Sequence, residues 1–313
     1  MYFYLKKGFS MIITILAVTV ITFVSFQIIP GDPVLSRLGV DADQAQIEAL
    51  KEELNLNKPL ATRYFIWLKG VFTGNMGQSF RYSVPVSDLI LSRISVTFIL
   101  ALISLLLIIF VGVPLGIVSA RYNNKIPGLF ISFISQIGMA VPSFWTGILL
   151  MFLFGIVLKW FSISGYVSWS ENPLLCIKSL TLPAVSIAIP NIATVIRYMK
   201  NMVLDEMKKE YVKTAYSKGL STSQVLSRHI LKNAIIPVIT ILGMITATIL
   251  GGSIIIEQVF SLPGIGRLLI NAITTRDLPL VQGIIVYISV MIVIINFIID
   301  IFYTIIDPRI RFN

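Results

Sequence analysis

Apolar residues follow one another along this chain in six long runs that contain no charged side chain. A helix needs about 20 mostly apolar residues to cross roughly 30 Å of hydrocarbon. Each run is long enough for one crossing, so the pattern predicts six transmembrane helices. In chain order the runs are Gly8–Gly31, Ile94–Ala120, Ile126–Leu158, Ser179–Ile196, Asn233–Ile256 and Leu278–Ile299.

The third run is long for one crossing, although two full crossings would not fit into it. Pro127, Gly138 and Pro142 lie inside it, and prolines are a common cause of a sharp bend in a helix. We therefore expect this segment to be tilted, kinked or partly interfacial.

Lysines and arginines favour one side of the membrane. If the N-terminus is cytoplasmic, the short cytoplasmic segments carry more than half of the 25 basic residues, and the largest group lies between the fourth and fifth runs. Most of the others lie in the long segment 32–93, where an equal number of acids balances them. Long loops count little for orientation, so the positive-inside rule predicts that both termini are cytoplasmic.

Composition agrees with a membrane protein. Of the 313 residues 56% are hydrophobic and 13% charged, with a mean hydropathy of +0.88, which excludes an ordinary soluble domain. Basic flanks beside anionic headgroups account for the net charge of +10 without a nucleic-acid partner. The single cysteine, Cys176, excludes an internal disulfide and a multi-thiolate metal cluster, so an inert thiol is expected.

The chain has no visible energy source of its own. No Gly-Lys dipeptide occurs, so a phosphate-binding loop of the G-x-x-x-x-G-K-[ST] type is absent. The six runs hold no ionisable side chain, whereas ion-coupled carriers keep such groups inside the membrane. Uphill transport would therefore need another subunit to supply energy.

Three domains follow from the runs: an N-terminal transmembrane helix at 1–31, an extracytoplasmic helical segment at 32–93, and a core of five transmembrane helices at 94–313. In the middle segment, Asp41 or Asp43 can cap a helix that carries Ile47, Leu50 and Leu54 and ends before Lys58-Pro59. A short amphipathic stretch follows at Tyr64–Leu68. The segment is either a cap over the span ends or a docking surface.

The segment between the fourth and fifth runs predicts a helical hairpin. Leu204, Met207, Tyr211 and Ala215 fall on one face of a helix, and Gly219 provides the left-handed residue that ends it. Ser221-Thr222-Ser223-Gln224 then reads as a capping box that starts a second helix, which leads into the span near Pro237. Such a hairpin either lies in the headgroup region or enters a groove on a soluble partner. The spacing leaves both alternatives open.

Few single residues suggest chemistry. The only histidine, His229, has no second histidine or cysteine pair for a metal, so a packing or hydrogen-bonding role is expected. Gln136, Asn191 and Asn296 either line a translocation pathway or form hydrogen bonds between helices, and the second alternative is favoured. Small residues at four-residue steps, Gly112 with Gly116 and then Gly243, Ala247 and Gly251, predict close helix packing.

Many short motifs follow one another in a fixed order along the chain. They are Ile29-Pro30-Gly31-Asp32-Pro33, Arg63-Tyr64 with Trp67-Leu68, Pro85-Val86, Gly112-Val113-Pro114-Leu115-Gly116, Pro142-Ser143-Phe144, Tyr211-Val212-Lys213-Thr214-Ala215, Lys218-Gly219-Leu220, Arg228-His229, Leu262-Pro263-Gly264-Ile265-Gly266, Asp277 with Pro279, and Asp307-Pro308-Arg309. In this order they resemble the first of the two permease subunits of oligopeptide, dipeptide and nickel-type ABC importers. The resemblance extends from end to end and is specific because the motifs are independent of one another.

The resemblance implies an all-α membrane protein with the permease fold of type I ABC importers. The hairpin would be the coupling loop, or EAA loop, at about 198–237, whose short helix sits in a groove of an ATPase subunit. The residues carried over to it are Tyr211, Lys213, Thr214, Ala215, Lys218, Gly219, Leu220, His229 and Pro237. Lys213 stands where the general pattern has glutamate, a departure that peptide-type members share.

The implied partners are a second homologous permease subunit, two ATP-binding subunits that use ATP and magnesium, an extracytoplasmic solute-binding protein and the bilayer of a bacterial-type cytoplasmic membrane. The chain itself would be no enzyme and would bind no cofactor, metal or nucleic acid. Short peptides are the favoured substrate, and nickel or a metallophore complex is the alternative. A self-contained channel or carrier is the contrasting hypothesis, and it predicts flux without nucleotide.

Overall fold

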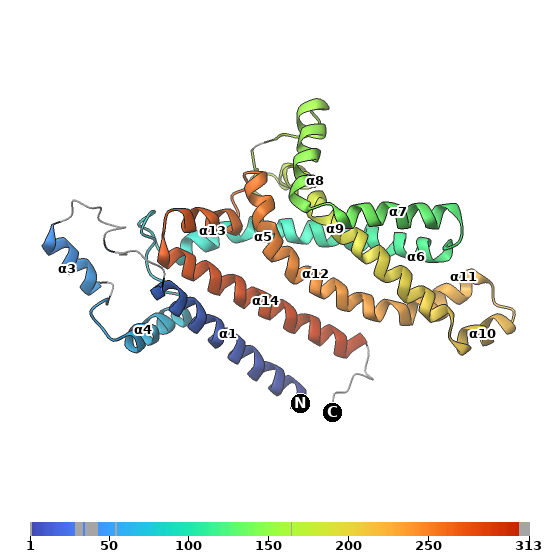
Figure 1. Cartoon of the computed structure of the whole chain (residues 1–313), viewed down its shortest axis with the longest axis horizontal. Helices are drawn as coiled ribbons and strands as arrows, with labels where there is room; N and C mark the ends of the chain where they lie inside the picture. The colour runs from blue at the N-terminus through green and yellow to red at the C-terminus, as the bar shows by residue number, and fades with distance from the viewer. Residues whose placement is uncertain (1, 29–33, 35–42, 54, 164, 307–313) are drawn as a thin grey trace. The chain divides into compact units, whose positions relative to one another are not determined.

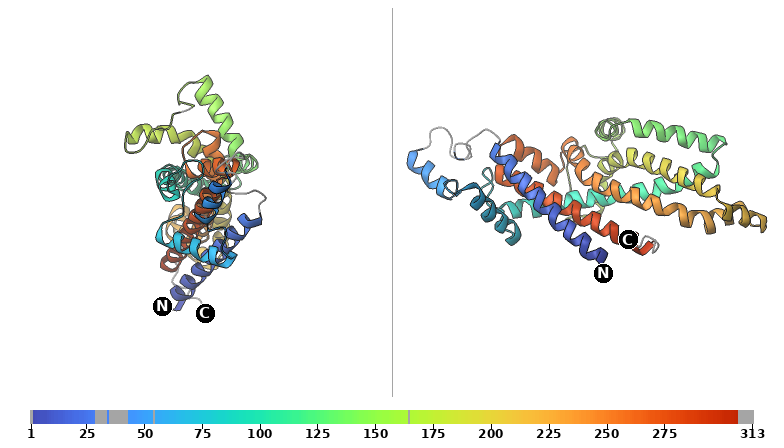
Figure 2. Two further views of the ribbon diagram at one scale, coloured as in Figure 1. Left: turned by 90° about the vertical axis from the view of Figure 1, so that its left-hand side faces the viewer. Right: turned by 60° about the horizontal axis from the view of Figure 1, so that its bottom comes forward.

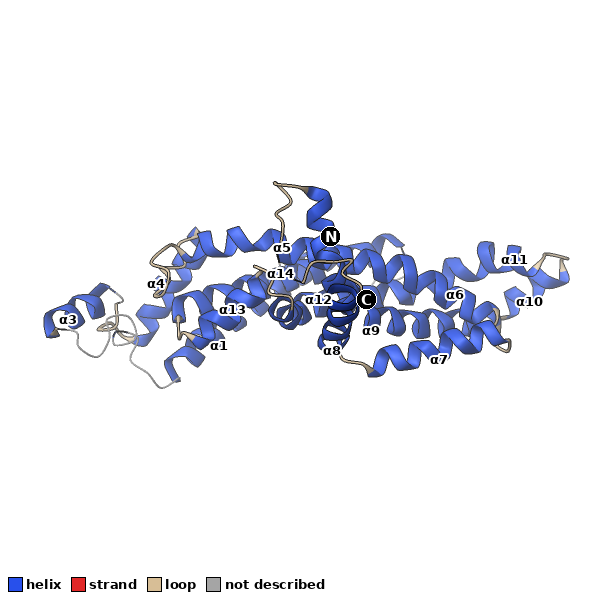
Figure 3. Ribbon diagram, turned by 90° about the horizontal axis from the view of Figure 1, so that it is seen from above, coloured by secondary structure: helices blue, strands red, loops and turns tan. Residues whose placement is uncertain are grey.

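The computed structural model describes residues 2–28, 34, 43–53, 55–163 and 165–306. Apart from one isolated bridge between Gln78 and Pro85, the regular structure of this part is helical (Figure 3). The prediction of an all-helical membrane protein is confirmed, because five helices are long and apolar enough to cross a membrane and a bent pair forms a sixth candidate span.

The helices in chain order (Figure 1) are α1 (Tyr2–Ile28), α3 (Gln44–Glu53), α4 (Leu60–Thr73), α5 (Val86–Leu107), η1 (Ile108–Gly112), α6 (Val113–Arg121), α7 (Ile126–Ala140), α8 (Ser143–Leu150), η2 (Met151–Val157), α9 (Pro173–Met207), α10 (Glu210–Ser217), α11 (Thr222–Val225), η3 (Leu226–Ile230), α12 (Leu231–Val259), α13 (Ile265–Thr274) and α14 (Leu278–Ile306). The three η segments are π-helical. η1 lies between α5 and α6, η3 lies between α11 and α12, and η2 ends the helix that begins with α8.

The third apolar run is sharply bent, as expected. The axes of α7 and of α8 with η2 differ by 102° across a short break, which is the geometry of a broken span or a re-entrant loop. The bend lies at Val141-Pro142, where Val141 is extended with φ −91° and ψ 123°. Proline disfavours the α conformation in the residue before it, so Pro142 accounts for the position of the bend.

Several helices continue beyond their charge-free runs. α5 begins at Val86 and so includes Asp88 and Arg93, while α9 begins at Pro173, capped by the Asn172 side chain, which accepts from the backbone N–H groups of Leu174 and Leu175 at 3.1 Å. A helix needs no break at a single charge that has a partner or reaches water. The charge-free criterion therefore placed the helix ends too far inward.

One of these extensions corrects the expectation that the spans lack ionisable groups. α12 continues past Ile256 to Val259, and this last turn contains Glu257, whose side chain is fully buried. Thr97 Oγ1 donates a hydrogen bond of 2.7 Å to Glu257 Oε1. A buried acid with such a partner is tolerated, because hydrogen bonding offsets part of the cost of removing it from water.

The chain divides into two compact units, the first made of Met1–Ser95 with Pro263–Ile294 and the second of Val96–Leu262 with Ile295–Asn313. In the second unit, α6, α7, α8 and α12 all pack against α9. α9 and α12 run side by side from the hairpin that joins them (Figure 1, Figure 2). The centre of α9 is buried over several turns, and Cys176 in its first turn is a buried free thiol.

Small residues allow the close packing predicted from their spacing. A Cβ on Gly116 would lie 2.6 Å from Met199 Cβ, and one on Gly243 would lie 2.6 Å from Ile299 Cγ2. α6 and α9 therefore approach as closely as glycine allows. Gly251 differs, because no atom of the described residues lies within 4 Å of the position of its Cβ.

In the first unit, the described part of the segment expected to be extracytoplasmic, 32–93, forms helices where they are predicted. α3 begins directly after Asp43, while Asp41 and Leu54 lie outside the described residues. α4 begins after Pro59 and ends at Thr73, so it extends past the expected stretch Tyr64–Leu68 at both ends. It packs on α1, where Tyr64 Oη lies 3.0 Å from Thr19 Oγ1 and Phe23 contacts the rings of Tyr64 and Trp67.

A second polar contact in this unit fixes the loop before α5. Asp277, buried at the start of α14, accepts hydrogen bonds from Ser79 Oγ at 2.5 Å and from the backbone N–H groups of Phe80 at 3.1 Å and Arg81 at 3.2 Å. Its Oδ1 also lies 3.4 Å from the N–H of Leu280 in the first turn of α14. One carboxylate therefore caps a helix and anchors a loop.

Candidate functional site

The segment that sequence reasoning singled out forms a hairpin at one end of α9 and α12 (Figure 1). α10 follows the end of α9, and α11 continues through η3 into α12 as one helix over Thr222–Val259. Pro237, expected near the start of the span, lies inside α12. The second arm of the hairpin and the span thus form one continuous helix.

The expectation that Leu204, Met207, Tyr211 and Ala215 share one helix is wrong. α9 ends at Met207, Lys209 is extended with ψ 148°, and α10 begins at Glu210. The contacts of the Glu206 side chain explain the break. Because the chain turns after Met207, Lys209 Nζ lies 2.7 Å from Glu206 Oε2 and the Tyr211 hydroxyl donates to Glu206 Oε1.

A polar network centred on Glu206 joins the three helices at this corner. Glu206 is only 6% exposed, and its Oε1 accepts from the Tyr211 hydroxyl and from Asn233 Nδ2 at 3.2 Å. Asn233 Nδ2 also lies 3.0 Å from Tyr211 Oη. His229 contributes its backbone carbonyl, 3.4 Å from Tyr211 Oη. The network ties α10 to the end of α9 and to the start of α12.

The network changes the acid–base properties of the two groups in the turn and α10. The hydrogen bond to Glu206 raises the pKa of Lys209 above its ordinary value, and the negative charge of Glu206 adds to this. Burial raises the pKa of Tyr211, and its hydrogen bond to Glu206 acts in the same direction. Lys209 therefore stays charged and Tyr211 stays protonated across the neutral range.

The apolar side of the hairpin packs against the chain itself. Val212 and Ala215 of α10 and Val225, Leu226 and Ile230 of the second arm are buried in the same core as α9. Leu220 packs against this core from the turn. The amphipathic pattern is thus explained by packing within the chain.

The turn has the geometry that the sequence predicts. Gly219 has φ +82°, the left-handed conformation that glycine adopts without strain. Ser221 caps the next helix, since its N–H donates to Gln224 Oε1 at 3.0 Å and its Oγ accepts from the Gln224 N–H at 3.4 Å. Both predictions are local, and both are confirmed.

The outer face of the hairpin is polar and basic. Lys213, Thr214, Tyr216 and Ser217 of α10 are exposed, as are Lys218 and Arg228. Lys213 Nζ lies 2.7 Å from Glu210 Oε1. Among the described residues, neither Lys218 nor Arg228 takes part in an ion pair. The face thus offers hydroxyls and unpaired positive charge around the Gly219 turn.

The three candidate pathway residues lie apart from this site. Gln136 on α7 and Asn296 on α14 lie on the surface of this single chain. Asn191 Nδ2 donates to the carbonyl of Ile187 at 2.8 Å, within its own helix. Within the described residues, no group of three His, Cys, Asp or Glu side chains is placed to hold a metal ion.

Sequence reasoning missed Glu206, Lys209 and Asn233. The sequence pattern singles out none of the three, and Asn233 appears only as the first residue of an apolar run. Glu206 follows Met199 and Val203 by seven and three residues, which places it on the buried side of α9. That spacing was the available signal for Glu206, because an acid buried among apolar residues requires a polar partner.

Comparison with known proteins supports one family over nearly the whole chain. Residues 112–312 match the family described as binding-protein-dependent transport system inner membrane component, and residues 1–101 match the corresponding N-terminal family. A protein of Brucella abortus named as a peptide transport system permease is 39% identical over 309 residues, which is 99% of this chain and 98% of that protein. The oligopeptide transport system permease protein AppB of Bacillus subtilis is 35% identical over 311 residues, 98% of each chain.

The fold is also similar to a solved structure. An inward-facing form of the MetNI methionine ABC transporter matches 70% of this chain and 96% of its own, with a TM-score of 0.56 and 13% identity. At this identity the likeness concerns the fold alone, and it agrees with a type I importer permease. The chain belongs to the family of binding-protein-dependent transport system inner membrane components.

Proposed function

We propose that this chain is a permease subunit that carries short peptides across the cytoplasmic membrane, driven by ATP hydrolysis in partner subunits. The relatives named as peptide and oligopeptide permeases cover 98% or more of this chain at 35 to 39% identity, which supports the substrate class. Family membership supports a solute-binding protein as the source of the peptide. The hairpin formed by α10, the Gly219 turn and α11 is the site where an ATPase subunit docks.

The observation that carries this docking role is the division of the hairpin into two faces. Its apolar residues are buried in the chain's own core, and its outer face is exposed, polar and basic. A hairpin that lay in the headgroup region would need apolar side chains for the acyl boundary. A polar outer face on a rigid support suits a protein groove instead.

The same geometry supplies a route for motion from the hairpin into the membrane. The second arm of the hairpin continues as one helix over Thr222–Val259, so a displacement of the turn rotates or shifts the span. The Glu206 network ties α10 to α9. Movement imposed on α10 by an ATPase is therefore passed to two spans together.

The complete importer contains this chain, a second homologous permease subunit and two ATP-binding subunits. ATP and magnesium bind to those ATPases, while this chain contributes transport helices and no catalytic group. Tyr211, Lys213, Thr214, Ala215, Lys218, Gly219, Leu220 and His229 belong to the docking hairpin or its support, and Pro237 lies just beyond it.

The test is peptide uptake into vesicles that contain the assembled importer, measured together with ATP hydrolysis. Replacement of Gly219 by valine is expected to abolish uptake, because a β-branched residue at φ +82° is strained by roughly 1–2 kcal/mol and the turn reorients. Beyond Gly219 and its two neighbours in the chain, no atom of the described residues lies within 4 Å of the new Cβ, so the effect comes from the turn and not from a clash.

Gly74→Val is the matched control. Gly74 has φ +79° and equally open space, but it ends α4 in the extracytoplasmic segment. Uptake that survives Gly74→Val and is lost in Gly219→Val supports docking at the hairpin. Full uptake by Gly219→Val contradicts it, and flux without nucleotide contradicts the importer itself.

A further inference from the structure

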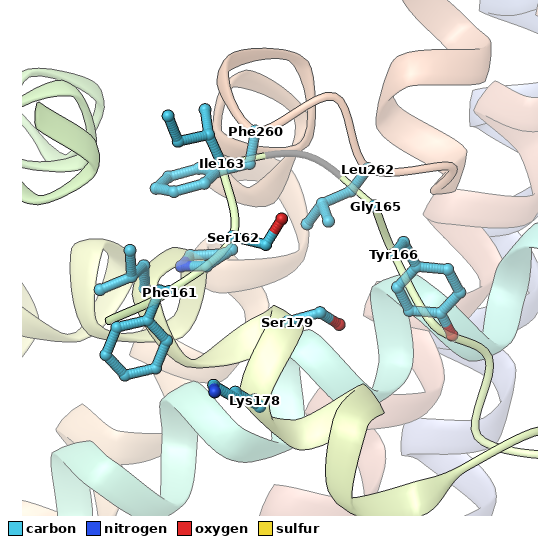
Figure 4. Close-up of a pocket in the computed structure, with 11 residues that line it drawn as sticks. Phe161, Ser162, Ile163, Gly165, Tyr166, Lys178, Ser179, Phe260 and Leu262 are labelled. Atoms are coloured by element: carbon cyan, nitrogen blue, oxygen red, sulfur yellow. The ribbon is translucent and has the colours of Figure 1, made fainter. Parts of the chain in front are cut away.

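A small open pocket lies at the end of α9 that is opposite the hairpin (Figure 4). It measures about 320 Å³, including its mouth. Lys178 and Ser179 line it from the first turns of α9, Phe161 and Ile163 from the segment before α9, and Phe260 from the end of α12. With a cytoplasmic N-terminus, this end of α9 faces outward, on the side where substrate arrives.

The walls of the pocket are held in place by neighbouring backbone. The N–H groups of Trp160 and Phe161 both donate to the carbonyl of Phe154, at 2.9 and 3.2 Å. The ring of Phe260 lies against Gly147, where an added Cβ would be 3.0 Å from Phe260 Cε2. The apolar walls are therefore set before any ligand binds.

The polar groups of the pocket are few and different in kind. Lys178 is the only charged residue in the lining, and none of the ion pairs among the described residues involves it. Pro183, also in the lining, has no N–H to donate to the carbonyl of Ser179 four residues earlier. The lining thus combines a cation with a backbone acceptor that lacks its usual helical donor.

Burial and the hydrogen bond with Cys176 raise the pKa of Tyr166, another lining residue, to about 12. Its hydroxyl therefore stays neutral, and Lys178 is the only source of charge in the pocket. An anionic group joined to an apolar group and to an N–H donor is the ligand that these walls match.

We propose that this pocket holds the C-terminal end of a peptide during transfer into the permease. The terminal carboxylate pairs with Lys178, the last side chain lies against Phe161 and Phe260, and the last peptide N–H donates to the Ser179 carbonyl. The pocket is too small for a whole peptide, so it binds one end and places no requirement on the other residues of the peptide. This inference rests on the proposed peptide transport.

The experiment compares two substrates in vesicles that contain the complete importer and saturating solute-binding protein. One is a short peptide with an apolar last residue and a free carboxylate, and the other is the same peptide with a C-terminal amide. The variants are Lys178→Gln, Lys178→Arg and Lys159→Gln. Lys159 is exposed, precedes the same segment and does not line the pocket.

The ratio of free-acid to amide uptake is expected to fall about tenfold in Lys178→Gln, because a charge-assisted hydrogen bond is lost. Lys178→Arg and Lys159→Gln should keep the ratio of the unmodified importer. Any preference of the solute-binding protein for one of the two peptides is the same for all variants, so it cancels when the uptake ratios of the variants are compared. An unchanged ratio in Lys178→Gln, with normal ATP-driven uptake, overturns this inference alone, whereas absence of ATP-driven uptake in the unmodified importer overturns the proposed function.

A photoreactive phenylalanine analogue at position 161 gives a second measurement on the assembled importer. Crosslinking to the free-acid peptide that is lost in Lys178→Gln supports the pocket. Crosslinking to an anionic phospholipid, with no peptide adduct, means that the pocket holds a lipid headgroup and overturns the proposal.

Discussion

Replacement of Tyr211 by phenylalanine tests whether the Glu206 network holds the hairpin. The change removes one hydroxyl, which donates to Glu206 and accepts from Asn233 Nδ2 at 3.0 Å. A hydrogen bond to a charged group contributes about 1.5–3 kcal/mol. Tyr211 is 38% exposed, so water replaces part of this interaction and the lower end, about 1.5 kcal/mol, is expected.

The assay is thermal unfolding of the purified chain in detergent, read as an apparent Tm. A loss of that size corresponds to a fall of roughly 2–5 °C. Tyr216→Phe is the matched control, because Tyr216 lies on the same helix with the same exposure of 38% and has no hydrogen bond from its hydroxyl among the described residues. It should leave the Tm unchanged.

A double-mutant cycle separates the contribution of the Glu206 hydrogen-bond network from that of the Tyr211 ring. Tyr211→Phe combined with Asn233→Ala should cost less than the sum of the two single changes, by about 0.5 kcal/mol or more, because both act on Glu206. Strict additivity, or equal effects of Tyr211→Phe and Tyr216→Phe, would refute the reasoning that these side chains act together.

Two further predictions concern ionisation and the loop before α5. The pKa values of Lys209 and Tyr211 are raised above their ordinary 10.5 and 10.0, so their stabilising contribution is full below about pH 10 and is lost as the pH rises through the raised values. Amide exchange of the hairpin should therefore be constant between about pH 6 and 9, after correction for intrinsic rates, and increase only above about pH 10. In the loop, Asp277→Asn should speed tryptic cleavage after the exposed Arg81, while Asp88→Asn, at an exposed position, should not; equal cleavage in both would contradict the anchoring role of Asp277.

The features that could be predicted from the sequence depend on residues close together in the chain. Ser221 and Gln224 are three residues apart, and the bend of the third run follows from the single residue Pro142. Caps, glycine turns and proline bends are decided within one or two helical turns, so their residue types are enough to place them.

The features that could not be predicted depend on pairs that are distant in sequence. Glu206 and Asn233 are 27 residues apart, Thr97 and Glu257 are 160 apart, and Ser79 and Asp277 are 198 apart. No periodicity relates such residues, and each pair is decided by how helices pack. The break after Met207 lies between the two classes. No helix-breaking residue stands at positions 208 or 209, and the partners of Glu206 include Lys209 and Tyr211, three and five residues away, as well as the distant Asn233.

The pairing of Lys213 bears on how the hairpin meets its ATPase. By the resemblance, this lysine stands where the general coupling pattern has glutamate, which would suggest a reversal of charge at the centre of α10. Lys213 Nζ, however, lies 2.7 Å from Glu210 Oε1, so the charge at the centre of α10 is balanced within the helix. Among the described residues, Lys218 and Arg228 take part in no ion pair, and in the chain they lie before and after the Gly219 turn, respectively. Under the proposed docking, electrostatic recognition therefore concentrates at the turn, and the partner groove matches it with carboxylates there, because opposite charges across an interface guide association and fix its register.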